Sequence, residues 1–435
     1  MRSLSAVAAV FMVTLLSLHS LFAAEKPVTF RGQTIYVDGD PQQIWIGDKT
    51  SADAELVLLY TNYNAAVNSL RTEQKIEARV LVVGGGGAGG YGTNNGMNPG
   101  GGGGGGEVKE LENAAYEPGI LSMTIGAGGA QTTAKGNGEN GHPTSFVKPG
   151  ETITVLGGGG GGCQAAGNGG DDVATGGGGG GNGKAGGQGT LHKGGKAINA
   201  TRAGGGGGAN GDGIDSTATK GGNGGAGIKS DITGELLGYG GGGGGAQSSN
   251  STKDYVGFGV DGGGDGGRQN NAPGNGSLGT GGGGGGGGRA LATHASKAFN
   301  GGAGGSGVVI IRITKIYVEL KWKPIPVSAG GYDGKIFVDE NAVVSTDAPT
   351  GDLIITYTNT TVDGGLRFFD PKDSSLPPVW AKARVLVVGG GGGGGFINDR
   401  LGGAGAGGGA GGVVTGEGFV FDNSVEYSVS VGAGG

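Results

Sequence analysis

Short apolar runs alternate with tracts of glycine along most of the chain. Typical runs are residues 56–60, 80–83 and 308–313, which consist largely of valine, isoleucine and leucine. Runs of this length and composition, bounded by glycine and other turn residues, are typical of buried β-strands. We therefore expect a mainly β protein whose strands frame the glycine tracts.

The first 24 residues differ from the rest. Arg2 precedes a long apolar segment that ends in small residues at Ala23 and Ala24, which is the pattern of a cleaved secretory signal. An uncleaved N-terminal anchor is the alternative, because Phe22 is an imperfect partner for Ala24 at the cleavage site. No later segment is long and apolar enough to span a membrane. We therefore predict a signal peptide over residues 1–24 and a protein that is secreted or held on a bacterial cell surface.

The chain contains two copies of one module. The segment ARVLVVGGGG at Ala78 returns at Ala383, and the motifs IYVD at Ile35 and TIGAGG at Thr124 return as IFVD and SVGAGG about 300 residues later. A repeat of this length is a duplicated domain, not a solenoid unit. The predicted parts are a first glycine-rich β module over residues 25–316, a linker over 317–331 and a second module over 332–435.

The second copy covers only the early part of the first. The first copy continues past TIGAGG through ITVLGGGGGG and a long glycine-dominated tract to the strand VVIIRI, whereas the second stops at Gly435, within SVGAGG. A strand set cut at this point would expose its edges and apolar faces. We therefore expect the second module to be truncated, either because the natural protein is longer or because this chain is a fragment.

Composition and charge argue against several classes of protein. Glycine supplies 116 residues and proline only 13, with no strict Gly-X-Y period, which excludes collagen. The apolar runs argue against simple disorder. The formal net charge of −6 is modest, and the charges are scattered without a basic stripe. Nucleic acid is therefore not expected as a partner.

The stretch VLVVGGGGAGG is similar to the start of a nucleotide-binding domain and suggests an enzymatic alternative. A dinucleotide site would need Gly84, Gly86 and Gly89 at the N-terminus of a helix. Fifteen of the 23 positions from Gly84 to Gly106 are glycine, and each disfavours a helix by about 1 kcal/mol relative to alanine. Because a cost on the order of 15 kcal/mol exceeds the stability of a typical domain, we expect no helix and no cofactor here.

A bundle of extended glycine helices is the preferred interpretation of these tracts. In the polyproline II geometry, with three residues per turn, all backbone N–H and C=O groups point outward. Neighbouring helices can pair these groups, as burial requires, because no Cβ keeps the backbones apart. Uninterrupted runs should be inner helices, runs broken by Asn, Ala, Thr or Lys should be peripheral, and a flexible linker is the other possibility. The residues assigned a structural role are Gly84, Gly85, Gly86, Gly87, Gly103, Gly159, Gly178, Gly206, Gly243, Gly284 and Gly391.

The order of the motifs VLVVGGGG, IGAGG, SFV, ITVLGGGGGG and GVVIIRI resembles that of a known glycine-rich domain family. This family includes the extracellular glycine-rich region of anaplastic lymphoma kinase and leukocyte tyrosine kinase. The resemblance, over residues 26–316 and 332–435, implies a jelly-roll-like sandwich similar to tumour necrosis factor with inserted polyglycine II helices. The receptors' kinase domain, transmembrane helix and cysteine-bearing ligand region have no counterpart, so ligand signalling is not implied. The glycine-rich tips of phage tail-fibre adhesins, whose loops bind a host surface, are similar in composition.

Few residues have the spacing of a catalytic or metal site. His142, His192 and His294 are isolated in the sequence and match no metal-ligand motif. Two pairs of acidic residues lie among glycines, as in calcium-binding glycine loops: Asp171 with Asp172, and Asp261 with Asp265. The nonapeptide repeat of such loops does not recur in the chain. We therefore predict no catalytic, cofactor-binding or metal-binding residue.

The remaining candidates also favour a structural role. Cys163 is the only cysteine, so no internal disulfide can form. Trp45, Trp322 and Trp380 are expected in the core and not as an exposed carbohydrate-binding platform. We therefore expect an exported, non-catalytic structural or adhesive protein of a bacterial cell surface or extracellular matrix, with surface polysaccharide or another protein as partner. The alternatives are a nucleotide-binding enzyme and an extracellular carbohydrate-binding module.

Overall fold

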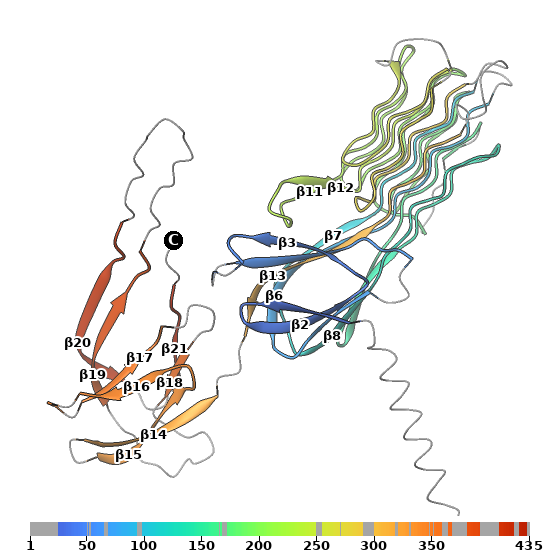
Figure 1. Cartoon of the computed structure of the whole chain (residues 1–435). Helices are drawn as coiled ribbons and strands as arrows, with labels where there is room; N and C mark the ends of the chain where they lie inside the picture. The colour runs from blue at the N-terminus through green and yellow to red at the C-terminus, as the bar shows by residue number, and fades with distance from the viewer. Residues whose placement is uncertain are drawn as a thin grey trace, which may run out of the picture. The chain divides into compact units, whose positions relative to one another are not determined.

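The described residues of the computed structural model form β-strands and extended segments without any α-helix, which confirms the predicted mainly β class (Figure 1). The chain separates into two compact units, with the main break between Lys315 and Ile316. The predicted signal peptide lies outside the described residues. These are residues 25–49, 51, 54–64, 68–93, 98–164, 166–167, 172–248, 255–269, 271–289, 300–317, 321–329, 332–347, 349–350, 352–358, 364–367, 381–391, 409–421 and 426–432.

Two antiparallel sheets form the framework of the first unit, and neither closes on itself. The six-stranded sheet has the order β1-β2-β5-β8-β9-β10, and the five-stranded sheet has the order β3-β4-β13-β6-β7. The strands are β1 (Lys26–Phe30), β2 (Gln33–Asp38), β3 (Gln42–Ile46), β4 (Glu55–Tyr60), β5 (Asn68–Thr72), β6 (Ile76–Val83), β7 (Val108–Tyr116), β8 (Gly119–Thr124), β9 (Thr144–Lys148), β10 (Glu151–Val155) and β13 (Val308–Ile316).

The central strands of the five-stranded sheet are buried on both faces. Residues 80–83 of β6 and 308–311 of β13 are all buried, which explains why these strands are continuous apolar runs without alternation. Tyr60 of β4 reaches the six-stranded sheet, where its hydroxyl donates a hydrogen bond to the carbonyl oxygen of Ser69 at 2.9 Å. The two sheets therefore share a buried core.

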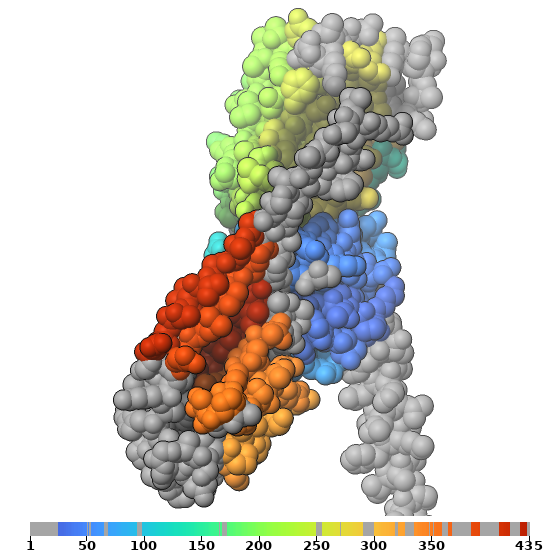
Figure 2. Space-filling view, turned by 60° about the vertical axis from the view of Figure 1, so that its left-hand side comes forward, coloured from blue at the N-terminus to red at the C-terminus, as the bar shows by residue number. Residues whose placement is uncertain are grey.

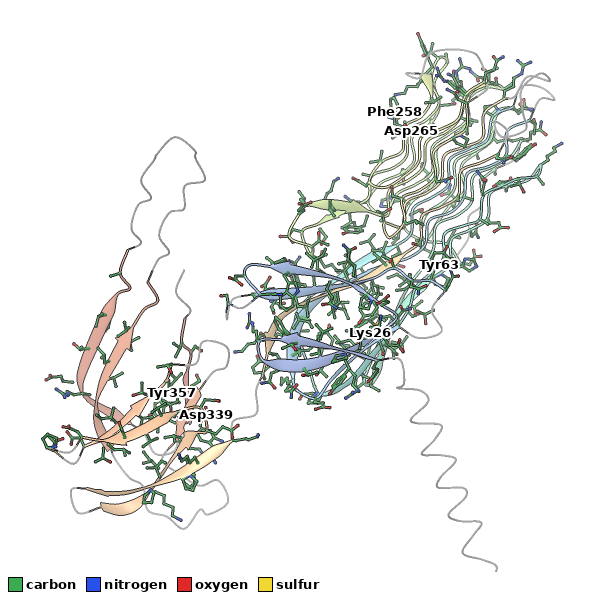
Figure 3. The ribbon with its side chains drawn as sticks, viewed as in Figure 1. Lys26, Tyr63, Phe258, Asp265, Asp339 and Tyr357 are labelled. Carbon is green, nitrogen blue, oxygen red and sulfur yellow. The ribbon has the colours of Figure 1, made fainter. Side chains whose placement is uncertain are left out.

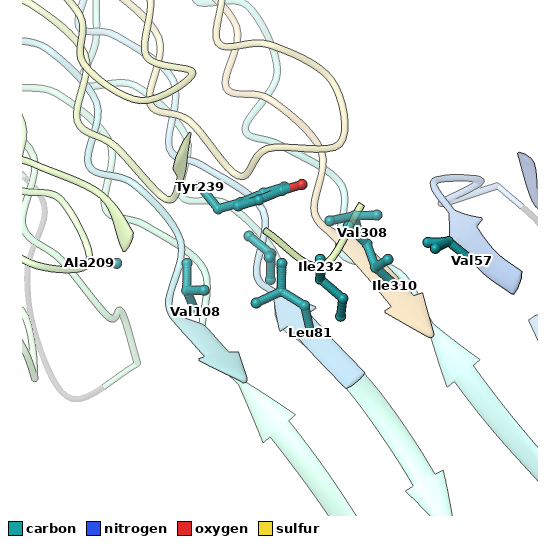
Figure 4. Packing of buried hydrophobic residues seen from close by; sticks show 9 residues of the cluster. Val57, Leu81, Val108, Ala209, Ile232, Tyr239, Val308 and Ile310 are labelled. Carbon is teal, nitrogen blue, oxygen red and sulfur yellow. The ribbon is translucent and has the colours of Figure 1, made fainter. Parts of the chain in front are cut away.

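A small hairpin from within the glycine tract covers the other face of the five-stranded sheet. It consists of β11 (Ile228–Ser230) and β12 (Leu237–Tyr239), which pair antiparallel. Ile232, between these strands, and Tyr239 belong to the same apolar cluster as Leu81, Val108 and Ile310 (Figure 4). This hairpin was not predictable from the sequence because its apolar residues are few and glycine surrounds them.

The second unit contains three small antiparallel sheets. One has the order β14-β15-β18-β21, and the others are the hairpins β16–β17 and β19–β20. Ile336, Val338, Ala342 and Leu366 form its buried apolar cluster. The strands are β14 (Trp322–Ala329), β15 (Tyr332–Asp339), β16 (Val343–Thr346), β17 (Leu353–Thr356), β18 (Gly364–Arg367), β19 (Ala381–Val388), β20 (Val413–Phe421) and β21 (Glu426–Val429).

The hairpin β19–β20 repeats β6–β7 in its register. A register shift lies between Ala78 and Val80 in β6, and another lies between Ala383 and Val385 in β19, at the same place in the repeat. In the first unit β13 pairs with β6, whereas no described strand takes that place beside β19. Figure 2 shows the described part of this hairpin in red and orange-red. Its apolar side chains that are more than half exposed are Leu386, Val387, Val388, Val413 and Val414.

Two of the three tryptophans do not lie in the core, so the prediction for them is wrong. Trp45 is half-buried in β3, an edge strand of the five-stranded sheet, where no described strand pairs with its outer side. Trp322 is half-buried in β14, and the guanidinium carbon of Arg367 lies 4.1 Å from its ring centroid. Trp380 lies outside the described residues.

Candidate functional site: the glycine bundle and its far end

The glycine tracts of the first unit form a bundle of extended segments that run side by side away from the two sheets (Figure 1). The segments join β6 at Gly84, β7 at Glu107 and β13 at Gly307. We call this the sheet end of the bundle. The opposite end, which we call the far end, consists of the turns that connect one segment to the next.

Hydrogen bonds between the segments repeat every three residues. The amides of Gly84, Gly87 and Gly90 donate to the carbonyl oxygens of Glu107, Gly104 and Gly101 at 2.9, 2.8 and 2.9 Å. The amide of the next residue in each triplet donates to a second segment, residues 136–142. The amide of the third residue donates to another segment, residues 302–305. Successive amides of one segment therefore donate in turn to three different neighbouring segments.

An inner segment is surrounded by other segments. Residues 100–106 form backbone hydrogen bonds with six of them, donating to three and accepting from three. All seven residues of this segment are buried glycines, so its outward backbone groups face carbonyls and amides and not water. The segments that accept from it are residues 159–162, 204–207 and 281–287, and those that donate to it contain residues 87–90, Gly178 and residues 243–246.

Most of the glycines predicted to be structural lie in this packed interior, where a side chain has no room. A Cβ built on Gly284 would collide with the carbonyl oxygens of Gly302 and Ala303. Gly391 differs, because it is exposed in the second unit and its nearest neighbour would be in ordinary contact with a Cβ. The predicted glycines that are buried in the bundle are Gly84, Gly85, Gly86, Gly87, Gly103, Gly159, Gly178, Gly206, Gly243 and Gly284.

At the periphery of the bundle, asparagine side chains take the place of backbone carbonyls. The amide of Gly160 donates to Asn140 Oδ1 at 3.0 Å, and the amide of Cys163 donates to Asn137 Oδ1 at 2.8 Å. Both the acceptors and the donors are three residues apart, which matches the period of the bundle. An acceptor side chain at this spacing is therefore a sequence signal for an outer segment, which adds a spacing of three residues to the prediction that runs broken by Asn are peripheral.

Aspartates form the same kind of contact on other outer segments. Asp212 Oδ1 accepts from the amide of Lys193 at 3.2 Å, and Asp215 Oδ1 accepts from the amide of Lys196 at 2.6 Å. Again both pairs have a spacing of three. These carboxylates therefore belong to the hydrogen-bond network of the bundle.

The acidic residues whose sequence context is similar to calcium-binding glycine loops also accept hydrogen bonds from backbone amides. Asp261 Oδ2 accepts from Gly227 at 2.9 Å, and its Oδ1 accepts from the ammonium of Lys229. Asp265, labelled in Figure 3, accepts from Gly259 at 3.0 Å. Asp172 lies in a peripheral turn and Asp171 outside the described residues. In the described part of the chain, no three His, Cys, Asp or Glu side chains come together as a metal site would require.

The histidines and the cysteine are dispersed over the bundle. His142 is exposed, His192 Nδ1 lies 3.1 Å from Asp212 Oδ1, and His294 is outside the described residues. Cys163 is buried, and burial raises the pKa of its thiol, which disfavours the reactive thiolate.

The amides needed for a dinucleotide site are already engaged within the bundle. Gly84 donates to Glu107, while Gly86 and Gly89 donate to the carbonyl oxygens of Gly305 and Gly302, both at 2.9 Å. The described residues after β6 continue as an extended segment and not as a helix. A phosphate would have to displace backbone partners that are buried here. No helix within the described ranges is long and apolar enough to cross a membrane.

A family model for a glycine-rich domain matches residues 66–314 and 373–435. The chain belongs to the glycine-rich domain family. The first match takes in the bundle of glycine segments, and the second falls in the repeated copy, so glycine-rich domain sequence is present in both. No curated protein matches the chain.

Proposed function

We propose that this glycine-rich domain protein is exported and has a non-catalytic structural or adhesive role on a bacterial cell surface or in an extracellular matrix. The observation that carries the proposal is the mutual pairing of backbone groups in the bundle. Because inner segments such as residues 100–106 are completely enclosed, only outer segments and turns are available for contact. The bundle then acts as a stiff support, and the turns at its far end supply the contacts.

In this proposal, the segments are polyglycine II helices inserted in a jelly-roll-like framework. Two observations support the helices. Donors rotate among three neighbours with a period of three residues, as a helix with three residues per turn requires, and an inner segment has six neighbours. The pairing of Tyr60 with Ser69 between the two open sheets supports a sandwich of this type.

The adhesive role can be tested with the mature chain, residues 25–435. Purified protein would be incubated with immobilised bacterial surface polysaccharides and with arrays of host glycans, and retention would be measured against an unrelated exported protein. Adhesion predicts saturable retention on at least one surface. Absence of retention on every surface would contradict adhesion and would leave the scaffold role.

A further inference from the structure

The described turns at the far end of the bundle carry more lysine and arginine than acidic residues. The chain as a whole has 36 acidic and 30 basic residues, so an even distribution would place both kinds at this end. The described turns of the far end are residues 91–93, 98–99, 131–137, 163–164, 181–184, 198–202, 216–220, 246–248, 255–256, 267–269 and 288–289, and their charged side chains are Lys135, Lys184, Arg202, Lys220, Arg268 and Arg289. The nearest described acidic residues, Glu139, Asp215 and Asp265, lie within two residues of these turns.

Hydrogen bonds join these turns into one surface. The amide of Asn182 donates to the carbonyl of Asn199 at 2.9 Å, which connects the turn of Lys184 to that of Arg202. Arg202 Nε donates to the carbonyl of Thr219 at 3.0 Å, which connects it to the turn of Lys220. The cations are therefore on adjacent turns.

Further hydrogen bonds extend this surface to the turns of Arg268 and Lys135. Ser248 donates its amide to Thr201 at 3.2 Å, and Gln247 donates to Gly267, next to Arg268, at 3.0 Å. On the other side Gly181 donates to Pro99 at 2.8 Å, and Tyr91 donates to Gly136, next to Lys135, at 3.2 Å. No described segment interrupts this series of turns.

Several acidic residues of the bundle have backbone or lysine partners. Three of them lie beside the far-end turns: Glu139 Oε2 accepts from the amide of Ala130 at 3.3 Å, and Asp215 and Asp265 accept from the amides of Lys196 and Gly259. Glu107 is at the junction with β7, where Oε2 accepts from the amide of Leu156 at 2.9 Å. Asp212 and Asp261 pair with Lys193 and Lys229 at the sheet end. The described residues at and beside the far-end turns thus include six cations and three carboxylates, an excess of positive charge although the net charge of the chain is negative.

The side chains that lie between the cations are suited to binding a carbohydrate. Asn, Thr, Ser and Gln dominate the described turns, and their amides and hydroxyls can both donate to and accept from sugar hydroxyls. Tyr255, at the far end, is 42% exposed, and the ammonium of Lys220 lies 4.4 Å from the ring centroid of Phe258 (Figure 3). Few cations, dispersed among neutral polar groups, fit a chain of sparse charge better than the dense phosphates of nucleic acid.

We propose that the far end of the bundle binds an acidic polysaccharide, one whose uronate carboxylates contact the lysine and arginine side chains. This inference rests on the adhesive role proposed above and names its ligand class. Lysine ammonium groups would pair with the carboxylates, and the amide and hydroxyl side chains would contact the sugar rings. Because the ion pairs would be exposed, salt should weaken the binding.

The test uses the mature full chain and alginate, a polymer of uronates, with neutral dextran and double-stranded DNA as comparison ligands. A far-end variant would carry Lys135→Gln, Lys184→Gln and Lys220→Gln. A matched variant would carry Lys26→Gln, Lys49→Gln and Lys109→Gln, which remove the same charge from exposed lysines of the sheet framework. Thermal denaturation would establish that both variants are folded.

The proposal expects wild-type protein to bind alginate better than dextran or DNA. It expects roughly tenfold weaker alginate binding by the far-end variant, less than about twofold change in the matched variant, and weaker binding as salt increases. Equal effects of the two variants, or tighter binding to DNA, would overturn it. Retention on neutral glycans alone would overturn the ligand class while supporting adhesion, whereas failure to bind any surface would contradict both.

Discussion

Leu81 and Leu386 occupy the same position in two copies of one β-hairpin, but Leu81 is fully buried and Leu386 is 64% exposed. The difference comes from their surroundings. Ile232 and Tyr239 of the inserted hairpin and Ile310 of β13 belong to the cluster that buries Leu81. The repeated hairpin presents the same apolar face without described neighbours of this kind.

This pair gives a direct test of packing in the first unit. Leu81→Ala should cost about 2–5 kcal/mol of unfolding free energy, because it leaves a cavity in a closed cluster. Leu386→Ala should change the unfolding free energy by less than about 1 kcal/mol, since little apolar area is uncovered. Chemical denaturation of each variant, followed by the signal of the affected unit, measures both. Equal costs would contradict the difference in burial.

Gly284→Val tests whether the bundle is packed. The new side chain would collide with the carbonyl oxygens of Gly302 and Ala303 and separate Gly284 from Gly87 and Gly103, its backbone partners at 2.9 and 2.8 Å. We expect a loss of more than about 3 kcal/mol in unfolding free energy.

The matched control is Gly136→Val, because a Cβ at Gly136 meets nothing within 4 Å. This change should stay within about 1 kcal/mol of neutral, as surface substitutions usually do. Denaturation midpoints of the two variants and the wild type decide the point. The same midpoint for all three would indicate that the run around Gly284 is a solvated linker.

Asn140→Ala tests the role of side-chain acceptors at the periphery. It would leave the amide of Gly160, which now donates to Asn140 Oδ1 at 3.0 Å, without that acceptor, at a cost of about 1–3 kcal/mol. Asn140→Asp keeps an acceptor oxygen in place and should retain most of the stability. Thermal unfolding of the two variants would compare them, and a loss of equal size in both would argue against the acceptor role.

Two buried tyrosines should respond differently to loss of the hydroxyl. Tyr60→Phe removes the buried hydrogen bond to the carbonyl oxygen of Ser69, so we expect a loss of about 0.5–1.5 kcal/mol. Tyr116→Phe removes a buried hydroxyl that has no hydrogen-bond partner in the described structure, so stability at neutral pH should be unchanged or higher. Denaturation at pH 7 compares them.

Tyr116 also predicts a dependence on alkaline pH. Burial, with a smaller contribution from Glu151, raises the pKa of Tyr116 to about 12 from its ordinary value of 10.0. The folded state therefore favours the neutral phenol, and the stability this gives is complete below about pH 10 and lost as the pH rises towards 12. The unfolding free energy of Tyr116→Phe should fall less steeply over this interval than that of the wild type. Parallel curves would contradict the assignment.

Nucleotides should not stabilise the protein. The amides of Gly84, Gly86 and Gly89 already donate to backbone carbonyls, so NAD, FAD and ATP should leave the melting temperature unchanged. A bound ligand at 100 times its dissociation constant would add about 2.7 kcal/mol, which a thermal-shift titration detects. A clear shift with any of the three would favour the enzymatic alternative.

The apolar runs made the strands predictable, because residues such as those of VLVV and VVIIRI are buried on both faces and leave a continuous signal. The packing role of the inner glycines was also predictable, since a buried run without side chains must pair its backbone with other backbone. The roles of Asn137 and Asn140 were not, because their spacing acquires meaning only beside Gly160 and Cys163. The positive charge at the far end could likewise not be predicted from the sequence, since its cations come together only after the chain has turned many times.

The hydrogen bond from Gly86 to Gly305 joins residues more than 200 positions apart along the chain. The segment that contains Gly86 is among the first of the bundle to be synthesised, and one of its three acceptor neighbours is the last. Closing a loop of this size costs entropy before the contacts compensate, and folds dominated by such distant pairs form slowly. The segment around Gly86 therefore cannot complete its pairing step by step as the chain is synthesised. Its last acceptors, residues 302–305, are available only when the entire first module has been made.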